Sequence, residues 1–347
     1  MSVAVNEGLA QLSNNFMYSA MAVYTTAMVS FAAEAAFGSR GRVGRRAAAP
    51  ATPAEQSAGA AAGTGAGSGA GARSVPPSGP ASGGGVLAPP LEDEQRADDA
   101  GNRADQFGRI GISLTVLAFG LHFAAVFCRG LSVGRVPWGN MYEFSTASAL
   151  AVVGAFLFLL TRQDVRWLGI FVVTPVLLTL GLAVTVLYAD AGPLMPALQS
   201  YWLAIHVTAA VICTGAFTIG TLATLLFLVA DPYEKRHGGA RLGRLPAAQA
   251  LDTVAFRVFT FVFPLWTFAI MAGAIWAENA WGRYWGWDPK ETWSFITWVV
   301  FAAYLHARAT AGWRGRKAAA VALVGYACLL FNFIGVNVWI TGLHSYA

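Results

Sequence analysis

The hydrophobic pattern of this chain is dominated by long apolar runs. Eight of them approach or exceed the roughly 18–20 residues that a helix needs to cross the hydrocarbon core of a bilayer. Short polar or charged segments separate the runs. The pattern therefore predicts an all-α fold, a polytopic membrane helical bundle of about eight transmembrane helices. The predicted spans are residues 15–37, 108–128, 141–160, 168–189, 200–230, 252–277, 290–311 and 317–341.

The composition indicates the same class. Hydrophobic residues make up 56% of the 347 residues and charged residues 12%, whereas a soluble domain has roughly 25% charged residues. The net charge of +5 gives no indication of a nucleic-acid partner, and the expected surroundings are the lipid bilayer. The three cysteines, Cys128, Cys213 and Cys328, form no Cys-x-x-Cys pair, which argues against thiol–disulfide exchange by this chain.

Lysine and arginine are distributed unevenly between the loops that separate the predicted spans. Alternate loops hold 19 of the 23 Lys and Arg residues, and the other loops hold 4. The split is still 11 to 4 when the long segment 38–109 is left out. Because Lys and Arg are enriched in cytoplasmic loops, we expect both termini and the loop after residue 277 to face outside the cytoplasm.

The first predicted span is separated from the others by a segment of low complexity. Residues 47–90 are almost wholly Ala, Gly, Pro and Ser, a composition that buries too little apolar surface to offset the entropy of the chain. We therefore predict an N-terminal transmembrane helix in 1–37, a disordered cytoplasmic linker in 38–106 and a functional membrane core in 107–347. The N-terminus lacks the basic region of a signal peptide, so we expect no cleavage there.

The most unusual stretch of the chain is segment 281–293, called the tryptophan loop below. It has four tryptophans in thirteen residues, more than the one or two rings that an aromatic belt places at each helix end. An aromatic belt is one interpretation, and a flat aromatic shelf that binds a large planar apolar ligand is the favoured one. The candidate binding residues are Trp281, Gly282, Trp285, Gly286, Trp287, Asp288 and Trp293.

A helix start is predicted inside the tryptophan loop. Asp288, Pro289 and Glu291 have the residue types of an N-cap, a first helical position and the third position of a capping box. Asp288 therefore has two interpretations, a structural helix cap or a polar contact for the ligand.

Two histidines are predicted to lie at the same outer face as the tryptophan loop. His206 lies a few residues inside the outer end of span 200–230, and His344 follows the last span. Ionisable residues are rare in membrane spans and indicate function by default. Two imidazoles beside several indoles are the parts needed to bind a haem iron from both axial sides. The predicted iron ligands are therefore His206 and His344, with a hydrogen-bonded structural role as the alternative.

The other histidines lie elsewhere. His306 is about 26 Å along a helix from Pro289, which places it near the cytoplasmic side, where it needs a partner of its own. His122 lies in the outer half of its span and is interpreted as a buried core histidine or as a relay group. His237 lies in a basic loop and is expected to be solvated.

These motifs, in this order, resemble one known family. The tryptophan loop is similar to the WWD signature of haem-handling proteins. Together with the segments around it, it resembles the CcsA/ResC family of System II cytochrome c biogenesis, labelled CcsB in some bacteria, over residues 107–347. The supporting segments are Asn140-Met-Tyr-Glu-Phe144, Tyr201-Trp-Leu-Ala-Ile-His-Val207, Tyr304-Leu-His306 and Gly342-Leu-His-Ser-Tyr346.

The resemblance implies a function. Proteins of this family bind haem b, deliver it across the membrane and present it at the outer face for thioether attachment to the CxxCH cysteines of apocytochrome c. The implied role is the haem-presenting subunit of a holocytochrome c synthase in a bacterial plasma membrane. His206 and His344 would bind the outer haem. His306 would bind an inner haem, and a CcsB/ResB-type membrane partner would supply its second ligand.

Other partners and functions follow from the same residues. The implied partners are apocytochrome c, the CcsB/ResB-type chain and thiol-reducing proteins. A b-type haem electron carrier is an alternative, although it would need paired membrane histidines for each haem. A small-molecule permease is another, although it would be expected to show inverted repeats and broken helices.

Overall fold

The computed structural model describes residues 5–48, 91–192, 198, 200–243 and 245–343. Within these residues all regular secondary structure is helical, which confirms the predicted all-α class. Seven helical segments are long and apolar enough to cross a membrane. The chain is therefore a multi-pass membrane protein.

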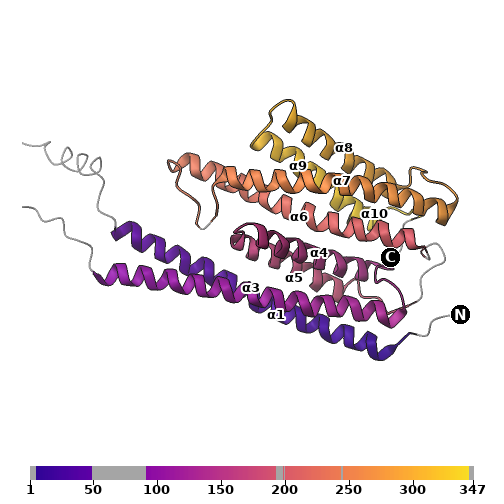
Figure 1. Cartoon of the computed structure of the whole chain (residues 1–347), viewed down its shortest axis with the longest axis horizontal. Helices are drawn as coiled ribbons and strands as arrows, with labels where there is room; N and C mark the ends of the chain where they lie inside the picture. Colours follow the sequence, from indigo (N-terminus) through magenta and orange to yellow (C-terminus); the bar gives the residue numbers. More distant parts are fainter. Residues whose placement is uncertain (1–4, 49–90, 193–197, 199, 244, 344–347) are drawn as a thin grey trace, which may run out of the picture. The chain divides into compact units, whose positions relative to one another are not determined.

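Each predicted span corresponds to a helix, or to α9, η3 and α10 together for the last one, although α1 and α3 run well beyond their predicted ends (Figure 1). Their bounds are α1 Glu7–Ala48, α3 Leu91–Val133, α4 Met141–Arg162, the 3₁₀ turn η1 Arg166–Leu168, α5 Gly169–Thr185, α6 Tyr201–Arg236, α7 Ala248–Trp281, α8 Pro289–Ala309, α9 Arg316–Leu330, the π-helical segment η3 Phe331–Gly335 and α10 Val336–Trp339.

Side-chain caps fix the starts of three helices. The side chain of Asn140 accepts a hydrogen bond at the start of α4, and Ser200 does the same for α6. At the start of α8, Asp288 and Glu291 form the predicted capping box. These caps satisfy backbone N–H groups that a first helical turn leaves without partners. They set where each helix begins at the end of the bundle that carries the tryptophan loop.

The eighth predicted span, 290–311, forms α8 at the predicted place but differs in composition. α8 is 21 residues long, and a helix of that length rises about 31 Å, enough to cross a bilayer. It is nevertheless not among the seven segments that are both long and apolar enough, because tryptophan, serine, threonine and charged residues interrupt its apolar run. Its crossing of the membrane stays a prediction.

The chain divides into two compact units, Met1–Ala33 with Phe107–Ala347, and Glu34–Gln106. In the second unit α1 continues to Ala48 and α3 begins at Leu91, so both helices extend into the segment expected to be an unstructured linker. Alanine, arginine and glutamate, which are frequent there, are strong helix formers. Residues 49–90 lie outside the described part of the chain, and the division into 1–37, 38–106 and 107–347 stays a prediction.

The larger unit has two main hydrophobic clusters. In one, Phe31 of α1 packs against Gly111 of α3 and Gly169 of α5, where added Cβ atoms would lie 2.8 and 2.5 Å from its ring. In the other, Phe217, Phe259 and Phe301 join α6, α7 and α8. Small residues let helices approach closely where the surrounding lipid is as apolar as the side chains.

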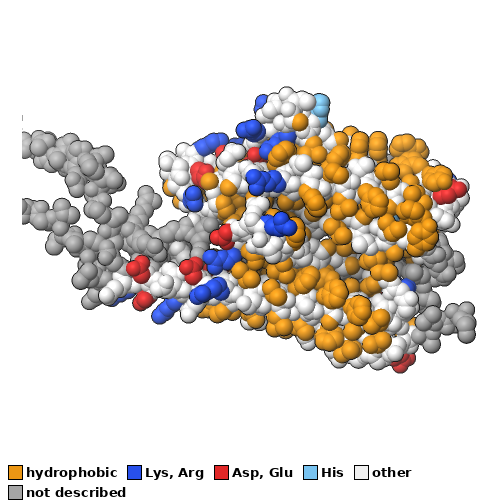
Figure 2. Space-filling view, in the orientation of Figure 1, with side chains coloured by type: hydrophobic (Ala, Val, Ile, Leu, Met, Phe, Trp, Pro, Cys, Tyr) orange, Lys and Arg blue, Asp and Glu red, His pale blue; other side chains and the backbone are white. Residues whose placement is uncertain are grey.

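Charge and apolar surface are separated on the outside of the larger unit. The loops α4–α5, α6–α7 and α8–α9 lie at one end of it, and the loops α3–α4 and α7–α8 lie at the other (Figure 1). Figure 2 shows hydrophobic side chains over most of the visible face and Lys and Arg gathered toward the first end. Large apolar side chains such as Leu178 and Phe261 are 71% and 68% exposed, as expected where helices face lipid.

Candidate functional site

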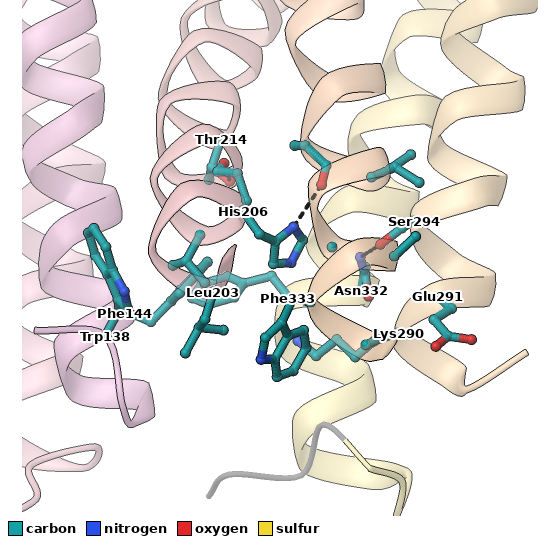
Figure 3. Close-up of a pocket in the computed structure, with 18 of the residues that line it drawn as sticks. Trp138, Phe144, Leu203, His206, Thr214, Lys290, Glu291, Ser294, Asn332 and Phe333 are labelled. Carbon is teal, nitrogen blue, oxygen red and sulfur yellow. Dashed lines mark hydrogen bonds between the residues drawn. The ribbon is translucent and has the colours of Figure 1, made fainter. Parts of the chain in front are cut away.

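A cavity lies in the larger unit between α4, α6, α7, α8 and η3 (Figure 3). Aromatic rings form much of its wall, and a few polar side chains interrupt the apolar surface. Such a mixture is typical of sites for cofactors and small molecules. The aromatic residues are Trp138, Phe144, Trp266, Trp276, Tyr284, Trp285 and Phe333, and the polar ones include His206, Lys290, Glu291, Ser294, Asn332 and Asn337.

His206 points into this cavity from the second turn of α6 (Figure 3). Its Nδ1 lies 2.8 Å from the carbonyl oxygen of Ala269 in α7. A carbonyl oxygen only accepts hydrogen bonds, so Nδ1 carries the proton and Nε2 carries the lone pair. A backbone carbonyl on the second ring nitrogen is the arrangement that orients metal-binding histidines.

The ring of His206 is held on two sides. Trp276 of α7 stacks nearly parallel to it, with ring centroids 6.1 Å apart and planes 8° apart. Gly273, one turn earlier, leaves the space that the ring occupies, because a Cβ there would lie 2.7 Å from Cε1 and Nδ1 of His206. The imidazole is therefore fixed in position as well as in protonation.

The tryptophan loop is shaped by the carboxylate of Glu291, which is 8% exposed. Oε2 of Glu291 accepts hydrogen bonds from the backbone N–H groups of Gly286 and Asp288 at 2.8 and 3.0 Å. Oε1 lies 3.5 Å from Nη1 of Arg283. One carboxylate thus ties three points of the loop to the first turn of α8.

The four tryptophans of the loop do not form one flat shelf. Trp285 lines the cavity, and Trp287 stands at 88° to it with ring centroids 5.7 Å apart. Trp287 is 65% exposed, and its positive φ of 57° is a strained backbone conformation for a bulky residue. Trp281 packs edge-on against Trp276, the neighbour of His206, and Trp293 packs against Phe331 of η3.

Asp288 is both a helix cap and an anchor for the end of the chain. Its Oδ1 accepts a hydrogen bond from the backbone N–H of Lys290, and its Oδ2 accepts one from Leu343. Leu343 is the last described residue before His344, which lies outside the described residues. The structure therefore brings His206 and Trp285 to one cavity and the segment leading to His344 to the cap of α8, while Gly282, Gly286 and Asp288 shape the loop without lining the cavity.

His306 lies near the opposite end of α8 from the tryptophan loop. Its side chain is exposed on the helix surface and does not line the cavity. Two residues further on, Arg308 forms a buried two-pronged ion pair with Asp252 of α7, at 2.8 and 2.9 Å. Within the described residues no group of three His, Cys, Asp or Glu side chains could hold a metal ion.

His122 is fully buried between helices and does not line the cavity. Its ring meets Tyr24 of α1 edge-on, with centroids 6.0 Å apart. The backbone of Thr146 in α4 is a polar neighbour of the ring. It is therefore a core histidine by position, the first of the two interpretations drawn from the sequence.

The segment 140–144 carried part of the family resemblance, but the sequence assigned no role to the charged residues behind the wall of the cavity where Trp138 stands. Glu143, which is 1% exposed, lies 3.0 Å from Nε of Arg129 and 2.7 Å from Nη1 of Arg135. It also accepts a hydrogen bond from Gly139 N–H at 2.8 Å. This buried ion cluster fixes the α3–α4 loop beside the cavity. In the sequence, the charged residues near the outer ends of two apolar runs could have indicated this ion cluster.

Comparison with known proteins identifies relatives across the whole cavity. Residues 138–344 match the family model described as cytochrome C assembly protein. The cytochrome c biogenesis protein CcsA of Synechococcus sp. (strain JA-3-3Ab) is 33% identical over 294 residues, which cover 69% of this chain and 84% of that protein. The CcsA protein of Chlamydomonas reinhardtii is 41% identical over 221 residues, 61% of each chain. That of Gloeobacter violaceus is 36% identical, covering 63% of this chain and 80% of the relative.

Proposed function

The chain belongs to the cytochrome c assembly protein family, and we propose that it binds haem b and presents it at the tryptophan loop for attachment to apocytochrome c. The orientation of His206 carries this proposal. Nδ1 donates a hydrogen bond to the carbonyl oxygen of Ala269, so that in the neutral ring Nε2 is the nitrogen that would bind the iron.

The residues around His206 fit haem. Trp138, Phe144, Trp285 and Phe333 supply apolar and aromatic surface for a large planar macrocycle. Burial of such surface contributes about 25 cal/mol per Å². Haem would supply the reactive vinyl groups, to which the two cysteine thiols of apocytochrome c add. The protein binds the macrocycle, orients it and limits access of water to it.

His344 is the proposed second axial ligand. It follows Leu343 directly, and Asp288 holds the backbone of Leu343. In this proposal the tryptophan loop, both termini and the outer haem lie on the extracytoplasmic side of a bacterial plasma membrane. The chain is then the haem-presenting subunit of a haem lyase complex.

His306 is proposed to bind a second haem nearer the cytoplasm. An exposed imidazole on a lipid-facing helix has room for an iron and for a ligand from another chain. A CcsB/ResB-type membrane partner would supply that ligand. Haem would pass from this inner site to the cavity at His206.

The central test is the axial ligation of the outer haem. In the complex purified with its membrane partner, His206→Gly is expected to lower the haem content or to leave five-coordinate iron. Added imidazole should restore the low-spin visible spectrum of the remaining haem. His237→Gly, at an exposed position, is the control. A double variant of His206 and His344 that keeps the wild-type spectrum and still matures cytochrome c would refute the proposal.

A further inference from the structure

Lys290 contributes a cation to the wall of the cavity that His206 also lines (Figure 3). Its side chain is half-buried at the start of α8. The charge of the Asp288 carboxylate acts on the Lys290 ammonium. The carboxylates of Asp288 and Glu291 also each accept hydrogen bonds from two backbone N–H groups.

Asn332 adds a polar group that lacks a partner. It is 7% exposed, lines the same cavity and lies in the π-helical segment η3. Its Nδ2 donates to Oγ of Ser294 at 2.9 Å, whereas its Oδ1 is buried and has no partner among the described residues. Single π-helical turns inside α-helices occur frequently at functional sites.

The amide of Asn332 can serve a ligand in either of its two orientations. Ser294 can accept from Nδ2, as in the structure, or donate its hydroxyl proton to Oδ1 after the amide turns over. In the second arrangement Nδ2 takes the place of Oδ1 and becomes the donor that lacks a partner. Buried polar groups are nearly always hydrogen-bonded, so the amide is best explained by a polar ligand group that completes its bonding.

Lys290 and Asn332 together favour the binding of an anion. A lysine ammonium beside an amide donor, in a cavity otherwise walled by apolar and aromatic side chains, suits a carboxylate on a largely apolar ligand. We propose that Lys290 and Asn332 bind one carboxylate of the ligand whose iron His206 coordinates, which under the proposed function is a propionate of haem. This inference rests on the proposed function, and the propionate is the group through which the protein would orient the haem. Because the vinyl groups are remote from the propionates on a porphyrin, fixing a propionate also fixes where the vinyl groups lie.

The test compares haem with haem dimethyl ester, in which both carboxylates are blocked. The complex with its membrane partner is stripped of haem and titrated with each compound, and the dissociation constants are taken from the visible spectrum. The wild type should bind haem about tenfold more tightly than the ester, as expected for one buried charge-assisted hydrogen bond. Lys290→Met should remove most of this preference and leave affinity for the ester unchanged.

Further variants separate charge from packing. Lys290→Arg should keep part of the preference, and Asn332→Asp should weaken haem binding more than ester binding, because it adds a negative charge. Lys317→Met, an exposed lysine at the start of α9, is the matched control. Equal affinity of the wild type for haem and ester, or an equal loss of both in Lys290→Met, would overturn the inference while leaving the His206 ligation intact. Haem binding that does not depend on His206 would instead refute the proposed function.

Discussion

Asp288 accepts a hydrogen bond from the backbone N–H of Leu343, with Oδ2 and the nitrogen 2.8 Å apart. A Cβ on the preceding Gly342 would lie 2.8 Å from the same oxygen, so glycine permits this close approach. The carboxylate that caps α8 thereby fixes the residue next to His344. The cap interpretation of Asp288 is confirmed, and its contact with a ligand stays a prediction. The same side chain also positions the segment that carries the proposed second ligand.

Asp288→Ser should separate these two roles. Serine is a good N-cap, so α8 should keep its start, but the shorter side chain cannot serve both Lys290 N–H and Leu343 N–H. We expect the outer haem to become partly five-coordinate, because the proposed ligand His344 is no longer held in place, and to regain low-spin character with added imidazole. Visible spectra of the purified complex measure this. An unchanged low-spin spectrum would show that Asp288 acts only as a cap.

Gly273→Ala should disturb the outer haem although it removes no ligand. The added methyl group would lie 2.7 Å from the ring of His206, so the imidazole must move away from the position that its bond to Ala269 defines. Haem content should fall and the axial ligation should change. Gly181→Ala in α5 is the matched control, because nothing lies within 4 Å of its added Cβ. Equal behaviour of the two variants would argue against a fixed imidazole.

Trp285 and Trp287 should differ when each is changed to alanine. Trp285 lines the cavity, whereas Trp287 is 65% exposed. Trp285→Ala should therefore lower the haem content of the purified complex, and Trp287→Ala should retain haem but impair attachment to apocytochrome c. Membrane insertion should be normal in both. If both variants retain haem and mature cytochrome c, the tryptophans are an interfacial belt.

Glu143→Gln should destabilise the protein strongly. It leaves the buried cations Arg129 and Arg135 facing a neutral amide, and breaking a buried ion pair costs about 3–5 kcal/mol. The midpoint of thermal unfolding of the purified protein should fall by several degrees. Asp164→Asn breaks an ion pair with Arg166 whose aspartate is 80% exposed, and it should change stability by less than about 1 kcal/mol. Similar shifts for both variants would contradict the assigned role of the cluster.

The sequence was sufficient for the helices and for part of the site. Long apolar runs place the helices, and the Asp288-Pro289-Glu291 pattern correctly gave the start of α8. Helix α8 itself shows the limit of hydropathy, because residues that face neighbouring helices lower its apolar content. The depth estimate correctly separated His306 from the cavity that His206 lines.

The remaining features of the site depend on tertiary contacts. The perpendicular rings of Trp285 and Trp287 follow from hydrogen bonds that Glu291 makes to the loop, which no spacing rule predicts. The π-helical segment that carries Asn332 has no local sequence signature. The cluster of Glu143 with two arginines requires the α3–α4 loop to fold back over the start of α4.

The last prediction concerns His306 and the two haem sites. Its side chain is exposed near the end of α8 remote from the tryptophan loop, so His306→Ala should leave the fold and the cavity intact. In cells the variant should carry less haem at the outer site, because the inner site that feeds it lacks a ligand. Any haem that does reach the outer site should keep its low-spin spectrum, since His306 lies about 26 Å of helix rise from Pro289, the start of α8 next to the cavity.

Two comparisons decide this prediction. His237→Ala removes another exposed histidine, at the end of α6, and should have no effect on haem content. The wild-type chain expressed without its membrane partner should show the same deficit as His306→Ala, because in both cases the inner haem has lost one ligand. If His306→Ala changes the axial ligation of the outer haem, or if the isolated chain fills both sites, then the inner site does not need a second chain. An electron carrier with both haems ligated by this chain would then explain the histidines better.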